Sequence, residues 1–347
     1  MNVKKYNKIF ITIILLGLML VICINTIFDI YRMIGLSNWN RKFVNANYRY
    51  VKAKYLKQHH DFDAYIMGTS RSNTYNSRLA SQLLGHNYYS FSVSLENIER
   101  IYEKLVWMKK QKFAVKQVIL CLDYDLMFLG DDLPPDAIDM KEHPEVSGEG
   151  WFSFYPSIFL KFDFINWRKV VRENFLKKKP PAYQFDVKSG HWYYLEAEAE
   201  IAKDHEKYAK DRVENNFSGV VKGFGDRTRV NLDRFREVIK FLKNEKIEYI
   251  VVINPYYISM FQKFDREAYK KWLKDVVNIS GGVWNFSGFN KVTQNKYLYY
   301  DTSHFMWSVG DQVLRRIAEG SEKQLAPDAF GDWVDEAHVE QYIRDHF

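Results

Sequence analysis

The chain has 347 residues, 17% of them aromatic, and a formal net charge of +7. This aromatic content excludes a disordered chain. The modest positive charge is spread over patches such as Lys177-Lys178-Lys179, which is typical of solvated surface; the alternative is attraction to anionic lipid or an acidic polymer. The two cysteines, Cys23 and Cys121, both lie in apolar runs, and we predict no disulfide between them.

The first predicted element is a membrane anchor at residues 9–28, an uncharged run that ends at Asp29. About 20 apolar residues are enough for a helix to cross the hydrocarbon core. Three basic residues precede the run: Lys4, Lys5 and Lys8. The positive-inside rule keeps residues 1–8 in the cytoplasm, so the rest of the chain is expected outside the plasma (inner) membrane, away from nucleic acid. A cleaved signal peptide is the alternative, but the run is long for one and no A-x-A-like site follows.

The next elements begin an alternation of strands and helices. After a juxtamembrane segment at 29–60, the apolar run Ala64 to Met67 stops at Gly68 and predicts a buried strand ending in a turn. The sequence then predicts a strand at Tyr88 to Val93, a helix at Ile98 to Met108 and a strand at Val118 to Leu122.

An irregular stretch at about 133–225, broken by several prolines, is interpreted as an insertion over one end of the sheet. Alternation then resumes with elements predicted at Val230 to Asn244 (helix), Tyr249 to Ile253 (strand), Arg266 to Val277 (helix), Val283-Trp284 (last strand) and Gly310 to Ile317 (helix). This order predicts a three-layer α/β/α domain at 61–320, with a mainly parallel sheet and helices on both faces. Residues 321–347 are left as a C-terminal tail.

A candidate nucleophile, Ser70, follows the first predicted strand directly in Gly68-Thr69-Ser70. In a parallel sheet the ligand lies beyond the carboxyl ends of the strands, and a sharp turn there exposes a hydroxyl beside backbone N–H groups. The alternative for such a serine is an ordinary helix cap.

A candidate base and its orienting carboxylate, His304 and Asp301, lie together in Asp301-Thr302-Ser303-His304 before the last predicted helix. A serine nucleophile needs a base to take its proton and a carboxylate to fix the imidazole tautomer. A second Asp-x-x-His pair, Asp335 to His338, follows no predicted strand and is interpreted as a solvated helix face.

This order of signals resembles the SGNH hydrolase superfamily, whose serine is in the first conserved block and whose Asp-x-x-His is in the last. The resemblance extends to the membrane-anchored SGNH-like proteins of bacterial surface-polysaccharide loci, including the alginate O-acetyltransferase accessory proteins. The matching segments are Ile66 to Arg71, Val118 to Asp123, Ile253 to Tyr256, Val283 to Asn290, and Asp301 to Phe305 with Gly310-Asp311. The resemblance implies an SGNH- or flavodoxin-like fold.

Two departures concern the oxyanion hole. The superfamily's second block supplies a glycine and its third an asparagine, and the corresponding stretches here, Ser90 to Leu95 and Leu122 to Asp125, contain neither. The N–H of Ser70 remains as one donor. Candidates for further oxyanion or substrate contacts are Arg71, Ser94, Asp123 and Asn254.

Several other polar and aromatic residues have plain structural alternatives. Asp123 and Asp125 are either strand-end caps or groups lining the cleft. The aromatic residues Trp284, Phe286 and Phe289 are expected in the core rather than as a sugar platform. His59-His60 with Asp61 and Asp63 lacks a third ligand motif, so no metal is expected there. No cofactor is expected either.

The resemblance implies an extracytoplasmic acyl-ester enzyme on a cell-envelope polysaccharide, with O-acetyl transfer favoured over hydrolysis. An exported domain has no acyl-coenzyme A around it, so a transferase would need an acyl carrier. The expected carrier is a polytopic membrane-bound O-acyltransferase. The alternative is a non-catalytic glycan-binding or assembly protein with the same fold, which the two departures favour.

Overall fold

The structure is a computed structural model that describes residues 3–36, 42, 46–129, 138–176, 181–214, 227–320 and 330–347. The Lys177-Lys178-Lys179 patch, the predicted insertion limits at about 133 and 225, and the first residues of the predicted tail lie outside these ranges. The chain divides into two compact units. The first comprises Met1–Tyr55, Pro134–Phe185 and Tyr193–Glu196; the second comprises Leu56–Leu133, Asp186–Trp192 and Ala197–Phe347.

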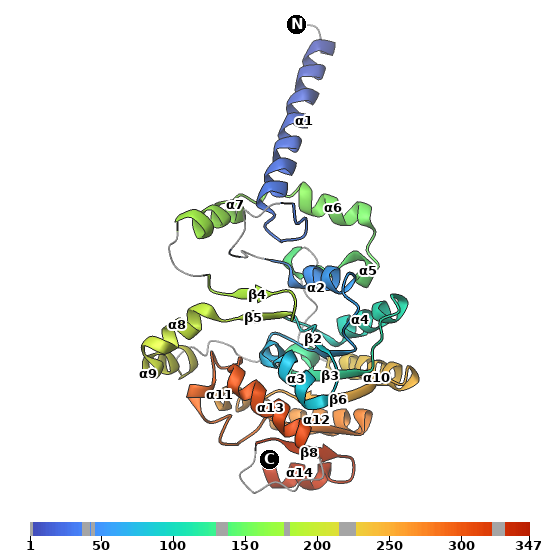
Figure 1. The fold of residues 1–347 in the computed structure, drawn as a ribbon, viewed down its shortest axis with the longest axis vertical. Coiled ribbons are helices and arrows are strands. Elements are labelled where there is room, and N and C mark those ends of the chain that lie inside the picture. Colours follow the sequence, from blue (N-terminus) through green and yellow to red (C-terminus); the bar gives the residue numbers. More distant parts are fainter. Residues whose placement is uncertain are drawn as a thin grey trace. The chain divides into compact units, whose positions relative to one another are not determined.

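The first unit begins with the long apolar helix α1 (Figure 1). Among the described residues, α1 is the one helix long and apolar enough to cross a membrane. The helices and turns that begin in this unit are α1 (Val3–Phe28), α2 (Tyr48–Leu56), η3 (Ile138–Met140), α5 (Pro144–Ser147), α6 (Trp151–Phe159), α7 (Phe164–Val171), η4 (Arg172–Leu176) and α8 (Leu195–Lys203). A core of buried residues from these elements includes Tyr50, Phe154 and Trp167.

The second unit is built on a six-stranded sheet in the order β2-β1-β3-β6-β7-β8. The strands are β1 (Ala64–Met67), β2 (Tyr88–Ser90), β3 (Gln117–Leu122), β6 (Glu248–Ile253), β7 (Gly282–Asn285) and β8 (Asp332–Asp335). The first five pair in parallel, and β8 pairs antiparallel with β7. A separate two-stranded sheet joins β4 (Gln184–Asp186) to β5 (His191–Tyr193).

Helices flank the six-stranded sheet (Figure 1). They and the short turns are η1 (Arg71–Thr74), α3 (Ser77–Leu84), α4 (Ile98–Lys110), η2 (Tyr124–Phe128), α9 (His205–Tyr208), η5 (Ala209–Glu214), α10 (Arg227–Asn244), α11 (Ile258–Phe261), α12 (Arg266–Ser280), η6 (Lys296–Leu298), α13 (Trp307–Glu319) and α14 (Val339–His346). Helices α4, α10 and α12 form one packed group, and α3 packs with α13. Alternate strand residues, such as Ile66, Ile119 and Val252, share one apolar cluster with Val313 of α13, as the period-2 pattern of a strand requires.

The predicted mixed α/β fold with a mainly parallel sheet and one apolar N-terminal helix is confirmed. The expectation that Asp335 follows no strand is wrong, because Asp335 is the last residue of β8. Strand β8 has acidic residues at both ends, so its sequence resembles a polar tail and only its pairing with β7 makes it a strand. The partner strand begins at Gly282, where an added Cβ would collide with the Trp333 ring. Glycine is therefore needed for this close pairing.

Candidate active site

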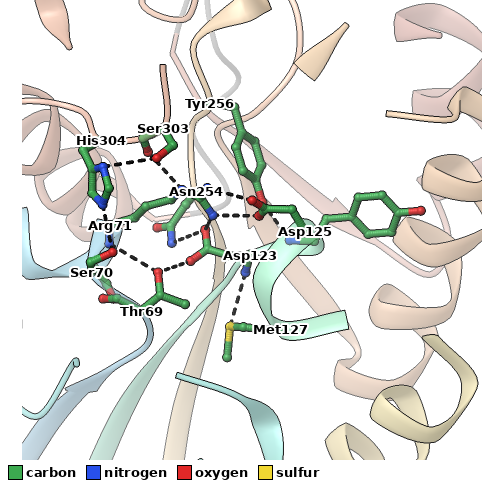
Figure 2. Close-up of polar contacts among 12 residues, drawn as sticks. Thr69, Ser70, Arg71, Asp123, Asp125, Met127, Asn254, Tyr256, Ser303 and His304 are labelled. Carbon is green, nitrogen blue, oxygen red and sulfur yellow. Dashed lines mark hydrogen bonds and ion pairs between the residues drawn. The ribbon is translucent and has the colours of Figure 1, made fainter. Parts of the chain in front are cut away.

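Ser70 lies at its predicted place, just after β1 and at the start of the η1 turn. The turn depends on Gly68, because a Cβ there would lie 2.8 Å from the carbonyl oxygen of Cys121. Ser70 occupies the cap position of η1, but its side chain makes no capping hydrogen bond. Its hydroxyl lies instead 2.8 Å from Nε2 of His304 (Figure 2). The plain helix-cap interpretation of this serine therefore does not hold.

Asp301 and His304 form a local pair on the loop that leads to α13. Nδ1 of His304 lies 2.8 Å from Oδ2 of Asp301. The other carboxylate oxygen accepts the backbone N–H groups of Ser303 and His304, each at 2.8 Å. Burial favours the neutral acid, but His304 and these N–H groups outweigh it and hold the pKa of the Asp301 carboxyl well below its usual range.

This pairing determines which nitrogen of His304 carries the proton. An ionised carboxylate only accepts hydrogen bonds, so the neutral imidazole must carry its proton on Nδ1, toward Asp301. Nε2 then presents a lone pair to the Ser70 hydroxyl. Ser70, His304 and Asp301 thus form one continuous chain of hydrogen bonds, which we call the relay. Its donors and acceptors follow the order that a nucleophile, a base and an orienting carboxylate require.

Arg71 lies beside the relay and is almost fully buried. Its guanidinium makes a bidentate ion pair with Asp125, at 2.7 and 2.8 Å, and lies over the Tyr256 ring. Its Nε donates to the carbonyl oxygen of Ser303 at 2.9 Å. Burial would lower the pKa of this guanidinium, but Asp125 and Asp123 raise it well above its ordinary value. A permanently charged side chain therefore ties the loop that carries His304 to the turn after β3.

Asp123 is the centre of a second set of contacts beside Thr69 (Figure 2). This carboxylate is fully buried and accepts from the hydroxyl of Thr69 and from Nδ2 of Asn254, at 3.0 Å for the latter. It lies 3.2 Å from Nη1 of Arg71. Burial raises the pKa of Asp123, and these donors oppose that shift. Asp123 makes no side-chain capping bond to η2, and its carboxylate belongs to this network.

Three of the four oxyanion or substrate candidates are thus held in the network. Arg71 donates to Asp125 and Ser303, and Asp123 accepts from three neighbours. Asn254 uses both ends of its amide, since its oxygen accepts from the hydroxyl of Tyr75 at 2.5 Å. Ser94, the fourth, is half-buried in the loop after β2. Sequence reasoning did not assign roles to Thr69 or Tyr256, although both lie in segments that follow strands and carry the resemblance.

The other candidates occupy plainer positions. Trp284 and Phe286 are buried in the core, as expected, whereas Phe289 is half-exposed and packs edge-on against Phe261. Within the ranges that the structure describes, no group of three His, Cys, Asp or Glu side chains could hold a metal ion. Asp63 belongs to the His59-His60 segment, where no metal is expected, and it forms an ion pair with Lys116 at 3.1 Å.

No protein-family model matches this chain, and no curated protein and no solved structure matches it either.

Proposed function

We propose that the protein is a membrane-anchored, SGNH-like acyl-ester enzyme that acts outside the cytoplasm on a cell-envelope polysaccharide. Ser70 is the nucleophile, His304 the general base and Asp301 the carboxylate that orients the imidazole. The observation that carries this proposal is the Ser70 to His304 contact of 2.8 Å, continued by the His304 to Asp301 contact of 2.8 Å.

In the proposed reaction, the Ser70 oxygen attacks the carbonyl carbon of an acyl ester while its proton passes to Nε2 of His304. The His304 imidazolium then gives this proton to the departing alcohol, and an acyl-serine remains. A second hydroxyl attacks this acyl-serine with His304 again as base, which regenerates Ser70. If the attacking hydroxyl belongs to a glycan the protein is a transferase, and if it belongs to water the protein is an esterase. The resemblance to polysaccharide-locus proteins favours transfer, with the acyl group delivered by a polytopic membrane-bound O-acyltransferase.

A second candidate function is non-catalytic glycan binding or assembly. It is favoured because the side chains of Arg71 and Asn254, two of the oxyanion candidates, already donate hydrogen bonds to carboxylates of the buried network. A missing oxyanion donor costs about a hundredfold or more in rate, so a chain with this fold can lose catalysis while keeping a glycan surface.

Reaction of the detergent-solubilised chain with a fluorophosphonate probe separates the two candidates. We expect labelling that disappears in Ser70→Ala and persists in Ser153→Ala, a control at an exposed serine of α6. Labelling that survives Ser70→Ala, or no labelling of the unmodified chain, would contradict the enzyme proposal.

The proposed topology has its own test, because three lysines precede the apolar run. A reporter that is active only outside the cytoplasm should be active when fused after Phe347. A reporter that works only in the cytoplasm should be silent at the same position, and the reverse pattern would overturn the proposed location.

A further inference from the structure

The first unit exposes a group of large apolar side chains on α6, α7 and the segments that adjoin them. Phe152 is 98% exposed, Ile165 80% and Phe162 71%. We call this group the apolar platform; its members are Trp151, Phe152, Leu160, Phe162, Phe164, Ile165, Phe175 and Leu176. These exposed residues all lie within positions 151–176, and large exposed apolar surface marks contacts with lipid or protein.

Helices α6 and α7, which carry most of the platform, lie beside the C-terminal end of α1 (Figure 1). Three residues on one face of that end, Val21, Ile24 and Phe28, pack against the buried core of the first unit, to which α6 and α7 contribute Phe154, Ile158, Trp167 and Val170. This spacing of three and four residues is that of one helix face. The last two turns of α1 therefore lie at the same level as α6 and α7.

A polar residue in this end of α1 makes the attachment specific. Asn25 is buried, and its Nδ2 donates to the carbonyl oxygens of Phe159 and Lys161, at 2.8 and 2.9 Å. Its Oδ1 accepts from Nε1 of Trp167 at 2.8 Å. The amide thus satisfies carbonyl groups at the end of α6 and links α1 to α7, so a polar side chain inside an apolar run is fully paired.

The length of α1 places its last two turns inside the membrane. The hydrocarbon core is about 30 Å thick, and residues 9–28 rise about 30 Å at 1.5 Å per residue. The part of the run before Val21, residues 9–20, rises only about 18 Å and cannot cross the hydrocarbon core alone. Lys8 and the lysines before it oppose a shift of the helix toward its N-terminus. Hydrocarbon must therefore reach Ile27, whose side chain is 44% exposed.

We propose that α6, α7 and their connecting turn lie in the outer leaflet of the bilayer that α1 crosses, with the apolar platform embedded in lipid. The inference rests on the membrane placement of α1 and is independent of catalysis at Ser70. A platform fixed at the level of Val21 to Phe28 has the same surroundings as that part of the helix. Three basic residues, Lys161, Arg168 and Arg172, lie close to platform residues in the sequence, and such residues are common in helices that lie in the membrane interface.

Spin labels placed on the platform test this inference in the full-length chain. The parent is Cys23→Ala, and Cys121 is buried. Labels are introduced by Phe152→Cys and Ile165→Cys. These side chains are 98% and 80% exposed, so replacing them should change the stability of the fold little. The control is Val230→Cys on α10, which is 59% exposed in the second unit. The proteins are reconstituted in vesicles of phosphatidylcholine and phosphatidylglycerol.

Collision of each label with oxygen, which concentrates in lipid, is compared with collision with a water-soluble nickel chelate. We expect labels at 152 and 165 to favour oxygen, at a depth of about 5–10 Å, and the label at 230 to favour the chelate. Two results would overturn the proposal. Labels at 152 and 165 that behave like the one at 230 would leave the platform in water, and labels shielded from both reagents would show a protein occupant instead.

Discussion

The chain contains two Asp-x-x-His pairs whose local geometry is nearly the same. Nδ1 of His304 lies 2.8 Å from Asp301, and Nδ1 of His338 lies 2.7 Å from Asp335. In both, the carboxylate also accepts the backbone N–H of its own histidine, at 2.8 and 3.0 Å. Four consecutive residues are thus enough to build a carboxylate and imidazole pair, and the pair by itself does not mark an active site.

The surroundings of the two pairs differ. The His304 side chain is 24% exposed and its Nε2 contacts Ser70. The His338 side chain is 70% exposed, and in the described part of the chain no hydroxyl group hydrogen-bonds to its ring. A chemically useful pair therefore requires a third residue brought from a distant part of the sequence.

Replacing the two histidines gives the largest expected difference. His304→Ala removes the proposed base, and we expect kcat/KM for a small soluble ester to fall by about 10⁵-fold. His338→Ala should leave this value within about twofold, because an exposed pair has no part in the chemistry. Equal effects of the two substitutions would abolish the distinction between the pairs.

Replacing the two carboxylates tests the orienting role. Asp301→Asn leaves a side chain of similar shape, but its amide favours the wrong imidazole tautomer, so a loss of about 10⁴-fold in kcat is expected. Asp335→Asn should leave kcat unchanged. Retention of more than about a tenth of the activity in Asp301→Asn would show that the carboxylate is not required.

The dependence of the rate on pH provides a third comparison. A general base must be neutral, so ester cleavage should rise with pH across the range in which imidazoles titrate, about pH 5 to 8. Although burial favours the neutral acid, contacts with His304 and backbone N–H groups lower the pKa of Asp301, so its carboxylate stays ionised through this range. A single ionisation is therefore expected, and His338→Gln should leave the profile unchanged. A flat profile would contradict the assignment of His304 as base.

The buried arginine that accompanies only the first pair is expected to have a smaller effect. Arg71→Lys keeps the charge but loses the planar fork that binds Asp125 and reaches the Ser303 carbonyl. We expect kcat to fall about tenfold with little change in KM, because the loop that carries His304 is less well positioned. Arg344→Lys, on α14 near the second pair, is the control. An equal loss of folded protein and activity would indicate a structural role alone.

The smallest expected effect is on stability at the second pair. Burial alone would raise the pKa of Asp335, but His338 and backbone N–H groups lower it overall. A carboxylate whose pKa is lowered by folding stabilises the folded state above its unfolded pKa of about 4, and this contribution is lost as pH falls through the folded value. Asp335→Ala should therefore lower the free energy of unfolding by about 1 kcal/mol at pH 7 and by less at pH 3, measured by urea denaturation. A loss of unfolding free energy that is larger at pH 3 than at pH 7 would contradict this prediction.

Sequence alone determined the elements whose signals lie within a few neighbouring residues. The apolar runs at 64–67, 118–122 and 249–253 alternate with amphipathic helices, and this pattern is enough to predict strands that are buried in a mainly parallel sheet. The same local reasoning placed Ser70 after a strand and Asp301 with His304 before a helix. Such predictions succeed because hydrophobic period and turn residues act over short distances in the chain.

Only the tertiary structure decided which of these local pieces belong together. Ser70 and His304 are 234 positions apart, and no short pattern distinguishes His304 from His338. Strand β8 and the Arg71 network were missed for the same reason. A short strand with acidic residues at both ends takes its identity from its hydrogen-bonded neighbour, and a buried arginine takes its role from carboxylates on a distant turn. Pairing and burial depend on chain segments that meet only on folding, which is why sequence proposes the residues of this site and the fold selects among them.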